Sequence, residues 1–431
     1  MGSESLEPLG TRAAASQDPD SAARRSGRSE GKLRSPRGQI DDLAFLVPGL
    51  LGFEHFSTFG YFADRVSAAL RAGLEQHWEK AVAVLPVPIP PTASLAERQR
   101  RLVKTLADRM EALGYRGEDL RIHLVGHSTG GVDAQLLTAE TPLVASRWSE
   151  VDPRAPRVLA CIASVVTLGS PHQGACITRD PVARLVSERR WRGLPDLAAL
   201  LTKFFWSTAR DIDLGTFVTS SLREGGKVAR FLLDIFAEWE LIADLQPTRD
   251  PASATYRTEI RRRSFVTLSG QPKGESSAVR PADAFYSDLA ARASGKLTGC
   301  ARLGRHIDAS VEALRRILTA PDAESRIIRN PGAELPPQID AEHNDGVVNS
   351  VRQLMDPSHP NEIEAIVVGD HFDVLGYYDR RVWKTDAQGR EQQLPVLAGL
   401  LHSGSGFGDD EFFTLYRRIA KVIASAADRR S

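Results

Sequence analysis

Short apolar runs recur along the chain, and stretches with helical spacing separate them. The runs occupy residues 43–47, 81–87, 122–125, 158–168, 264–268 and 364–368. Because these runs are almost continuously apolar rather than alternating, they predict strands that are buried on both faces. Helices are predicted over 62–73, 94–113 and 411–426, and in a stretch that opens at 126–130 and continues to about 139. Strands that alternate with helices indicate βαβ units, so we expect an α/β fold with a mostly parallel central sheet flanked by helices.

Two segments break this alternation. The first, residues 1–38, is rich in Ser, Arg, Gly, Asp and Ala, and predicts a disordered N-terminal tail. The second, at about 180–247, is rich in Phe and Trp and contains two helical stretches. We interpret it as a helical cap inserted into one large domain that covers 39–431. No internal repeat is evident.

Composition and charge narrow the classes of function. The 431 residues contain 55 Lys and Arg and 55 Asp and Glu, which gives a formal net charge of zero. Since no overall field attracts polyanions, we expect no nucleic-acid partner. We also find no uninterrupted apolar span of membrane length and no signal peptide, which predicts a cytoplasmic protein without a transmembrane segment. Export by a non-standard route stays open, and the oligomeric state is not indicated.

The three cysteines, Cys161, Cys176 and Cys300, lack the spacing of metal ligands and are odd in number. A disulfide scaffold is therefore not expected. We predict buried free thiols in a reducing compartment, with one pair left open as the alternative.

The candidate nucleophile is Ser128, in the sequence G-H-S-T-G at 126–130. It follows a predicted strand and opens a predicted helix, which is the context of a nucleophile elbow. In such a turn the serine has strained backbone, and Gly126 and Gly130 flank it because side chains there would collide with the neighbouring strand and helix. A structural or nucleotide-binding glycine turn is the alternative.

A serine hydroxyl needs a base, and the base needs an orienting acid. Asp345 lies in a turn-prone N-D-G sequence, and His371 directly follows the predicted strand at 364–368. Both are expected in loops at the carboxyl edge of the sheet, where open α/β sheets bind their ligands. His343 and His402 are the alternative bases, although neither follows a convincing strand.

Backbone N–H groups are needed to bind the oxyanion that forms when a serine attacks a carbonyl. We assign these donors to Leu50, in the loop after the first strand, and to Thr129, the residue after the nucleophile. His127 and His172 belong to the same motifs, and we expect them to be structural.

Five segments together resemble a known family. In chain order they are P-G-L-L-G at 48–52, G-H-S-T-G at 126–130, G-S-P-H-Q-G at 169–174, N-D-G-V-V at 344–348 and D-H-F-D at 370–373. As a set they are similar to the motifs of bacterial triacylglycerol lipases and related esterases of the α/β-hydrolase fold. The resemblance implies Ser128 as nucleophile, Asp345 as orienting acid, His371 as general base, and Leu50 and Thr129 as oxyanion donors.

The chain departs from the family pattern at several points. The family usually has a histidine where this chain has Pro48, so the support of the oxyanion loop is missing or replaced. Many of those lipases are secreted, with a signal peptide and a disulfide, and the sequence indicates neither. Some bind a structural calcium, for which Asp373 is the nearest candidate, but a second ligand carboxylate has no recognisable counterpart.

The sequence therefore predicts hydrolysis of a carboxylic ester through an acyl-serine intermediate, with a small-molecule or lipid ester as substrate and no required cofactor. An acyltransferase or thioesterase would use the same triad. A catalytically silent hydrolase-fold protein that binds a ligand is the alternative outside enzymes.

Overall fold

The computed structural model describes residues 41–50, 55–56, 59–79, 82–90, 92–115, 120–179, 240–248, 255–272, 284–378, 381–385, 391–395 and 403–427. The chain divides into two units, residues 1–39 and 40–431, and every described residue belongs to the second. The predicted tail at 1–38 lies outside the described residues. So does the predicted cap at about 180–247, except for a segment that contains helix α11 (Glu240–Asp244).

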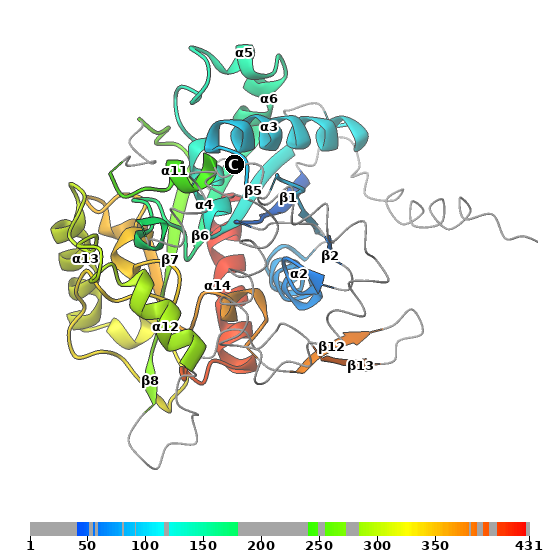
Figure 1. The fold of residues 1–431 in the computed structure, drawn as a ribbon. Helices are drawn as coiled ribbons and strands as arrows, with labels where there is room; N and C mark the ends of the chain where they lie inside the picture. The colour runs from blue at the N-terminus through cyan, green and yellow to red at the C-terminus, as the bar shows by residue number, and fades with distance from the viewer. Residues whose placement is uncertain are drawn as a thin grey trace, which may run out of the picture. The chain divides into compact units, whose positions relative to one another are not determined.

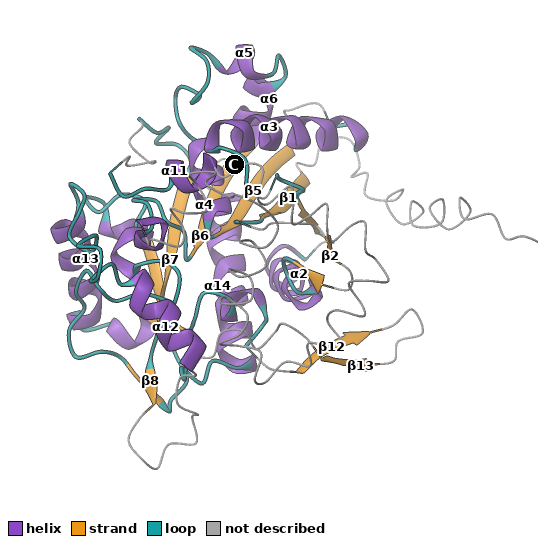
Figure 2. Ribbon diagram, viewed as in Figure 1, coloured by secondary structure: helices purple, strands orange, loops and turns teal. Residues whose placement is uncertain are grey.

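A seven-stranded sheet forms the centre of the second unit (Figures 1 and 2). In spatial order its strands are β4 (Ala83–Pro86), β1 (Asp41–Val47), β5 (Leu120–His127), β6 (Ile162–Leu168), β7 (Arg261–Leu268), β11 (Ile363–Val368) and β9 (Ile327–Ile328). Each neighbouring pair is parallel. The predicted parallel sheet is confirmed, and all its strands end at one edge.

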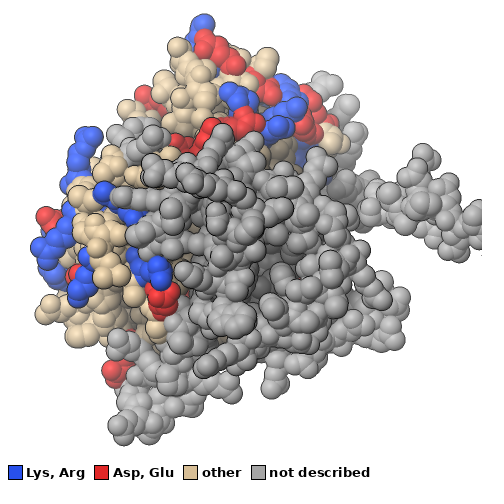
Figure 3. Space-filling model, in the orientation of Figure 1, with Lys and Arg blue, Asp and Glu red and all other residues tan. Residues whose placement is uncertain are grey.

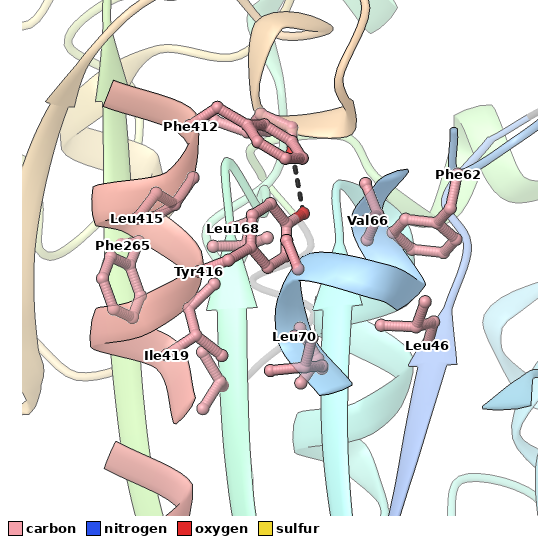
Figure 4. Packing of buried hydrophobic residues seen from close by; sticks show 14 of the residues in the cluster. Leu46, Phe62, Val66, Leu70, Leu168, Phe265, Phe412, Leu415, Tyr416 and Ile419 are labelled. Atoms are coloured by element: carbon pink, nitrogen blue, oxygen red, sulfur yellow. Dashed lines mark hydrogen bonds between the residues drawn. The ribbon is translucent and has the colours of Figure 1, made fainter. Parts of the chain in front are cut away.

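Helices cover both faces of this sheet, as predicted. The main ones are α2 (Asp64–Trp78), α3 (Leu95–Ala112), α4 (Thr129–Leu136), α6 (Ala155–Cys161), α12 (Ala284–Ala293), α13 (Ile307–Thr319) and α14 (Asp409–Ala427). Successive residues of β1 point to opposite faces, so Leu46 packs with α2 and α14 whereas Phe45 packs with α3. Figure 4 shows Leu46 of β1 in the same buried cluster as Leu70 of α2 and Tyr416 of α14. Strands buried on both sides explain why the apolar runs are continuous.

Short elements make up the rest of the described fold. Antiparallel pairs join β2 (His55–Phe56) to β3 (Phe59–Gly60), β8 (Gln271–Pro272) to β10 (Ala333–Glu334), and β12 (Arg381–Thr385) to β13 (Glu391–Pro395). Helix α5 (Trp148–Val151) and the 3₁₀ helices η3 (Cys176–Arg179), η4 (Ala323–Arg326), η5 (Ser350–Gln353), η6 (Pro360–Glu362) and η7 (Asp373–Leu375) lie in connections.

The predicted strand at 158–168 is wrong in its first four residues. Val158 to Cys161 form the end of α6, and β6 begins only at Ile162. Both parts are buried, and an apolar run of this kind does not distinguish a buried helix from a buried strand. Pro156, in the first turn of α6, is the residue that favours a helix start here.

The prediction of free thiols is also wrong for two of the three cysteines. Cys176 and Cys300 form a disulfide with a Cα–Cα distance of 5.6 Å, while the buried Cys161 lies outside it. The two partners are separated by 124 residues in sequence. Spacing alone therefore gave no indication of the pair. Disulfides persist mainly in oxidising compartments, and the cytoplasm is a reducing one. The disulfide therefore does not fit the predicted cytoplasmic location, and no other observation tests that prediction.

The charges on the surface agree with the balance in the sequence. Figure 3 shows basic and acidic side chains interleaved on the described part of one face. Several form pairs along α3, such as Arg101 with Glu97. None of the described helices combines the length and the apolar character needed to cross a membrane.

Candidate active site

Ser128 lies in a sharp turn between β5 and α4. Its backbone has φ 53° and ψ −133°, a conformation with positive φ that is rare for residues other than glycine. A Cβ at Gly126 would collide with the backbone of Gly130 and Gly131, and a Cβ at Gly130 would collide with the carbonyl oxygen of Val47 in β1. The two flanking glycines therefore let β1, β5 and α4 approach closely enough to form the turn.

His371 and Asp345 form a hydrogen-bonded pair. The distance between Nδ1 of His371 and Oδ2 of Asp345 is 2.8 Å, and the backbone N–H of His371 donates to the Asp345 carbonyl at 2.9 Å. Both side chains are buried, with 3% of His371 exposed. Because Nδ1 donates to the carboxylate, the neutral ring presents Nε2 as its acceptor.

Several donors fix the Asp345 carboxylate. Oδ1 accepts the backbone N–H groups of Val347 at 3.0 Å and Val348 at 2.8 Å. Oδ2 accepts the hydroxyl of Thr267 and, at 3.2 Å, the side-chain amide of Gln353. Sequence reasoning did not identify Thr267 or Gln353. Thr267 lies near the end of the predicted strand that became β7, and this position could have marked it as a site residue. Nothing in the sequence marks Gln353 as a site residue.

Backbone contacts place Ser128 near this pair. Its N–H donates to the carbonyl of Leu168, the last residue of β6, at 2.9 Å. The next residue is Gly169, where a Cβ would lie 3.2 Å from Oδ2 of Asp345 and 3.4 Å from Nδ1 of His371. The three predicted triad residues therefore gather where the parallel strands end, and 6% of Ser128 is exposed.

The loop after β1 carries Leu50, the predicted oxyanion donor. Within the described residues, neither the Leu50 N–H nor the Thr129 N–H has a hydrogen-bond acceptor. The carbonyl of Pro48 accepts a hydrogen bond from Arg98 at 2.9 Å. Arg98 in turn forms a fully buried ion pair with Asp133 of α4 at 2.6 Å. Arg98 therefore connects the loop after β1 to α4, the helix that follows Ser128.

Replacement of Arg98 by Met is expected to lower the free energy of unfolding by about 3–5 kcal/mol, because it leaves the buried charge of Asp133 uncompensated. Urea unfolding followed by circular dichroism measures this loss. Arg101→Met is the matched control, since Arg101 lies on the same helix in an exposed pair that contributes at most about 1 kcal/mol. Equal unfolding midpoints for the two variants would contradict the assignment.

The structure places His343 and His172 in contacts outside the proposed triad, and His402 is not described. His343 binds Asp340 at 2.8 Å, and His402 is outside the described residues. His172 is fully buried and contacts Thr167 through Nε2 at 3.2 Å. Burial, assisted by the charge of Arg262, lowers the pKa of His172 to about 3, which fits a structural role.

Asp373, the predicted calcium candidate, accepts hydrogen bonds from Asp370 and Ser405. Its Oδ2 accepts the N–H of Asp370 at 2.8 Å and the hydroxyl of Ser405 at 3.3 Å. Burial raises the pKa of Asp373 to about 7. Burial, and then the charge of Asp373, raise that of Asp370 well above its usual range. Among the described residues, no group of three or more His, Cys, Asp or Glu side chains could hold a metal ion, and calcium binding at Asp373 stays a prediction.

A second Ser, His and Asp set lies inside the sheet. Nδ1 of His123 is 2.8 Å from Oγ of Ser164, and Nε2 is 3.0 Å from Oδ1 of Asp42. These residues sit within β5, β6 and β1 and are buried, Ser164 and His123 completely. Since Ser164 is fully buried inside β6 and not in a turn at the end of a strand, we interpret this set as a structural network.

No protein-family model matches the sequence, and no curated protein is similar to it. Solved structures of bacterial lipases and esterases do match. EstA from Clostridium botulinum is 16% identical over 91% of this chain and 89% of EstA, with a TM-score of 0.47. The Staphylococcus hyicus lipase is 15% identical over 92% and 99%, with a TM-score of 0.42. Lipase 1 from Pelosinus fermentans is 15% identical over 90% and 99%, with a TM-score of 0.40. We base the fold class on the topology alone. A parallel sheet covered by helices, with the serine turn after β5 and the histidine loop after β11, has the α/β-hydrolase architecture that the sequence predicted.

Proposed function

We propose that the protein is a serine hydrolase that cleaves carboxylic esters, with lipid-like acyl esters as its favoured substrates. One observation carries this proposal: the hydrogen-bonded pair of His371 and Asp345 lies at the same sheet edge as Ser128, whose backbone has the strained conformation of a nucleophile elbow. A serine, a base and an orienting acid are the groups that acyl transfer to serine requires.

The proposed mechanism follows from the roles of these groups. His371 takes the proton of Ser128 through Nε2 as the hydroxyl attacks the ester carbonyl, and Asp345 stabilises the imidazolium that forms. The N–H groups of Leu50 and Thr129 bind the oxyanion. His371 then returns the proton to the leaving alcohol. Water attacks the acyl-enzyme by the same route and releases the acid.

The preference for apolar acyl groups is inferred from the surroundings of Leu50. Leu50 packs against a buried apolar cluster made of Leu95, Val132, Leu136, Leu241 and Leu245. Apolar side chains therefore lie beside the proposed oxyanion loop, which favours an apolar acyl group there. Two members of the cluster, Leu241 and Leu245, come from the only described part of the predicted cap, which suggests that the cap contributes to the acyl site.

A fluorophosphonate probe tests the proposal, because it reacts only with an activated serine. We expect the folded wild-type protein to be labelled and Ser128→Ala not to be labelled, as read by the mass of the modified peptide. Failure of the folded wild-type protein to react would overturn the enzyme assignment and favour a catalytically silent binding protein.

The substrate class is tested with p-nitrophenyl esters from acetate to palmitate. We expect kcat/KM to rise with acyl chain length. A preference for acetate would instead indicate a short-chain esterase. Product analysis in water with an added alcohol separates hydrolysis from acyl transfer, and we expect the free acid as the main product.

A further inference from the structure

Two hydrogen bonds and a close contact connect the oxyanion loop to the loop of the general base. The hydroxyl oxygen of Tyr61 lies against Gly49, where a Cβ would be only 2.6 Å from it. That hydroxyl lies 2.7 Å from Nδ1 of His127, and Nε2 of His127 lies 2.8 Å from the carbonyl oxygen of His371. Tyr61 and His127 are both buried. Three segments that are distant in sequence are therefore connected through two side chains, and the first of these side chains contacts the oxyanion loop.

Chemistry fixes the direction of these hydrogen bonds. A carbonyl oxygen only accepts, so Nε2 of His127 carries the proton and donates to His371. In the neutral ring Nδ1 then accepts, and Tyr61 donates to it. Burial, and then the neighbouring charge of His371, hold the pKa of His127 well below its usual range, which keeps the ring in this neutral form.

We propose that Tyr61 and His127 are positioning residues that set the oxyanion loop and the backbone of His371 at a fixed separation on either side of Ser128. The inference rests on the proposed function. It gives a role to His127 of the G-H-S-T-G sequence, which we expected only to pack.

The close fit around Ser128 explains why this separation matters. A Cβ at Gly49 would lie 2.6 Å from Cβ of Ser128 and 2.6 Å from the Tyr61 hydroxyl oxygen. The rings of His127 and His371 also pack together, with centroids 4.6 Å apart. At such distances the oxyanion loop cannot move toward Ser128 or Tyr61 without a clash, and the hydrogen bonds from Tyr61 to His127 and from His127 to His371 hold Tyr61 in place. Misplacement of catalytic groups by about 1 Å costs on the order of a hundredfold in rate.

Tyr61→Phe tests the first link, because it removes only a hydroxyl. We expect kcat for a p-nitrophenyl ester to fall by about tenfold to a hundredfold with KM little changed. Tyr115→Phe is the matched control: its hydroxyl donates to Asp41 at 2.9 Å, at the start of β1 and so at the opposite end of that strand. The control is expected to retain wild-type kcat. If both variants retain wild-type kcat, the positioning role of Tyr61 is excluded.

Two substitutions of His127 test the second link. The amide of His127→Gln reaches the place of Nε2 and donates to the His371 carbonyl, whereas His127→Asn reaches only the place of Nδ1. We therefore expect a kcat for Gln at least about tenfold above that for Asn at similar Tm values. A purely structural role would give equal kcat in the two variants, and that result would overturn the inference.

A double-mutant cycle tests whether the two residues act as one chain. We expect Tyr61→Phe combined with His127→Asn to lose no more activity than His127→Asn alone, since either change breaks the same connection. Additive losses would show that the residues act independently. Failure of the wild-type protein to react with the fluorophosphonate probe would remove the proposed function itself, whereas a reactive wild type with unaffected Tyr61 and His127 variants would remove only this inference.

Discussion

Ser128→Ala and His371→Ala are each expected to lower kcat by about 10⁴-fold to 10⁶-fold, with the protein still folded. The Ser128→Ala variant has no hydroxyl that could form the acyl-enzyme. The His371→Ala variant has no general base that could take the proton of Ser128. Asp345→Asn should lose somewhat less, about 10⁴-fold, because the base stays in place but in the wrong tautomer. Initial rates with a p-nitrophenyl ester, together with circular dichroism spectra, measure these losses.

Matched controls exist for both residues. Ser164→Ala and His343→Ala remove the same side chains at positions outside the proposed triad, and we expect the folded variants to keep wild-type kcat. His402→Ala tests the alternative base. A loss in His402→Ala as large as that in His371→Ala would show that the base is assigned wrongly.

Reduction of the disulfide between Cys176 and Cys300 is expected to lower the free energy of unfolding by about 2–5 kcal/mol. The bond closes a long stretch of chain, so its loss releases many conformations of the unfolded state. The disulfide also lies beside Arg352, whose guanidinium donates to the carbonyls of Cys300 at 2.9 Å and Gln173 at 2.9 Å. Urea unfolding with and without a phosphine reductant measures the effect.

Alkylation of the unfolded protein provides the direct test of this bond. Before reduction, iodoacetamide should modify only Cys161, and after reduction it should modify all three cysteines. Cys161→Ala should keep the sensitivity of stability to reductant, and Cys300→Ala should lose it. Modification of three cysteines without reductant would contradict the disulfide and support the prediction of free thiols.

Most of the sheet was predictable because its strands are buried on both faces. Strands β1, β5 and β11 end within two residues of their predicted ends, since a continuous apolar run ends where the polar edge of the sheet begins. Val158 shows where this signal fails. A buried helix and a buried strand give the same run of apolar letters, and only the tertiary structure decides between them.

The candidate site was predictable only in part. Ser128, Asp345 and His371 stand in local motifs whose turn residues and preceding strands are visible in the sequence. Tyr61 and Arg98 contact the motif segments from far along the chain, and their own neighbours in sequence give no sign of it. Long-range hydrogen bonds of this kind depend on how the strands are ordered, which the hydrophobic pattern does not specify.

The network of Asp42, His123 and Ser164 inside the sheet bears on how serine hydrolases are recognised from a structure. A template search that matches side-chain identity and hydrogen-bond distance would retrieve this network as readily as the pair at the sheet edge. Only Ser128 also has a positive φ, between the end of a strand and the start of a helix. A template for hydrolases that includes the backbone torsion of the serine would therefore reject the false positive within this one chain.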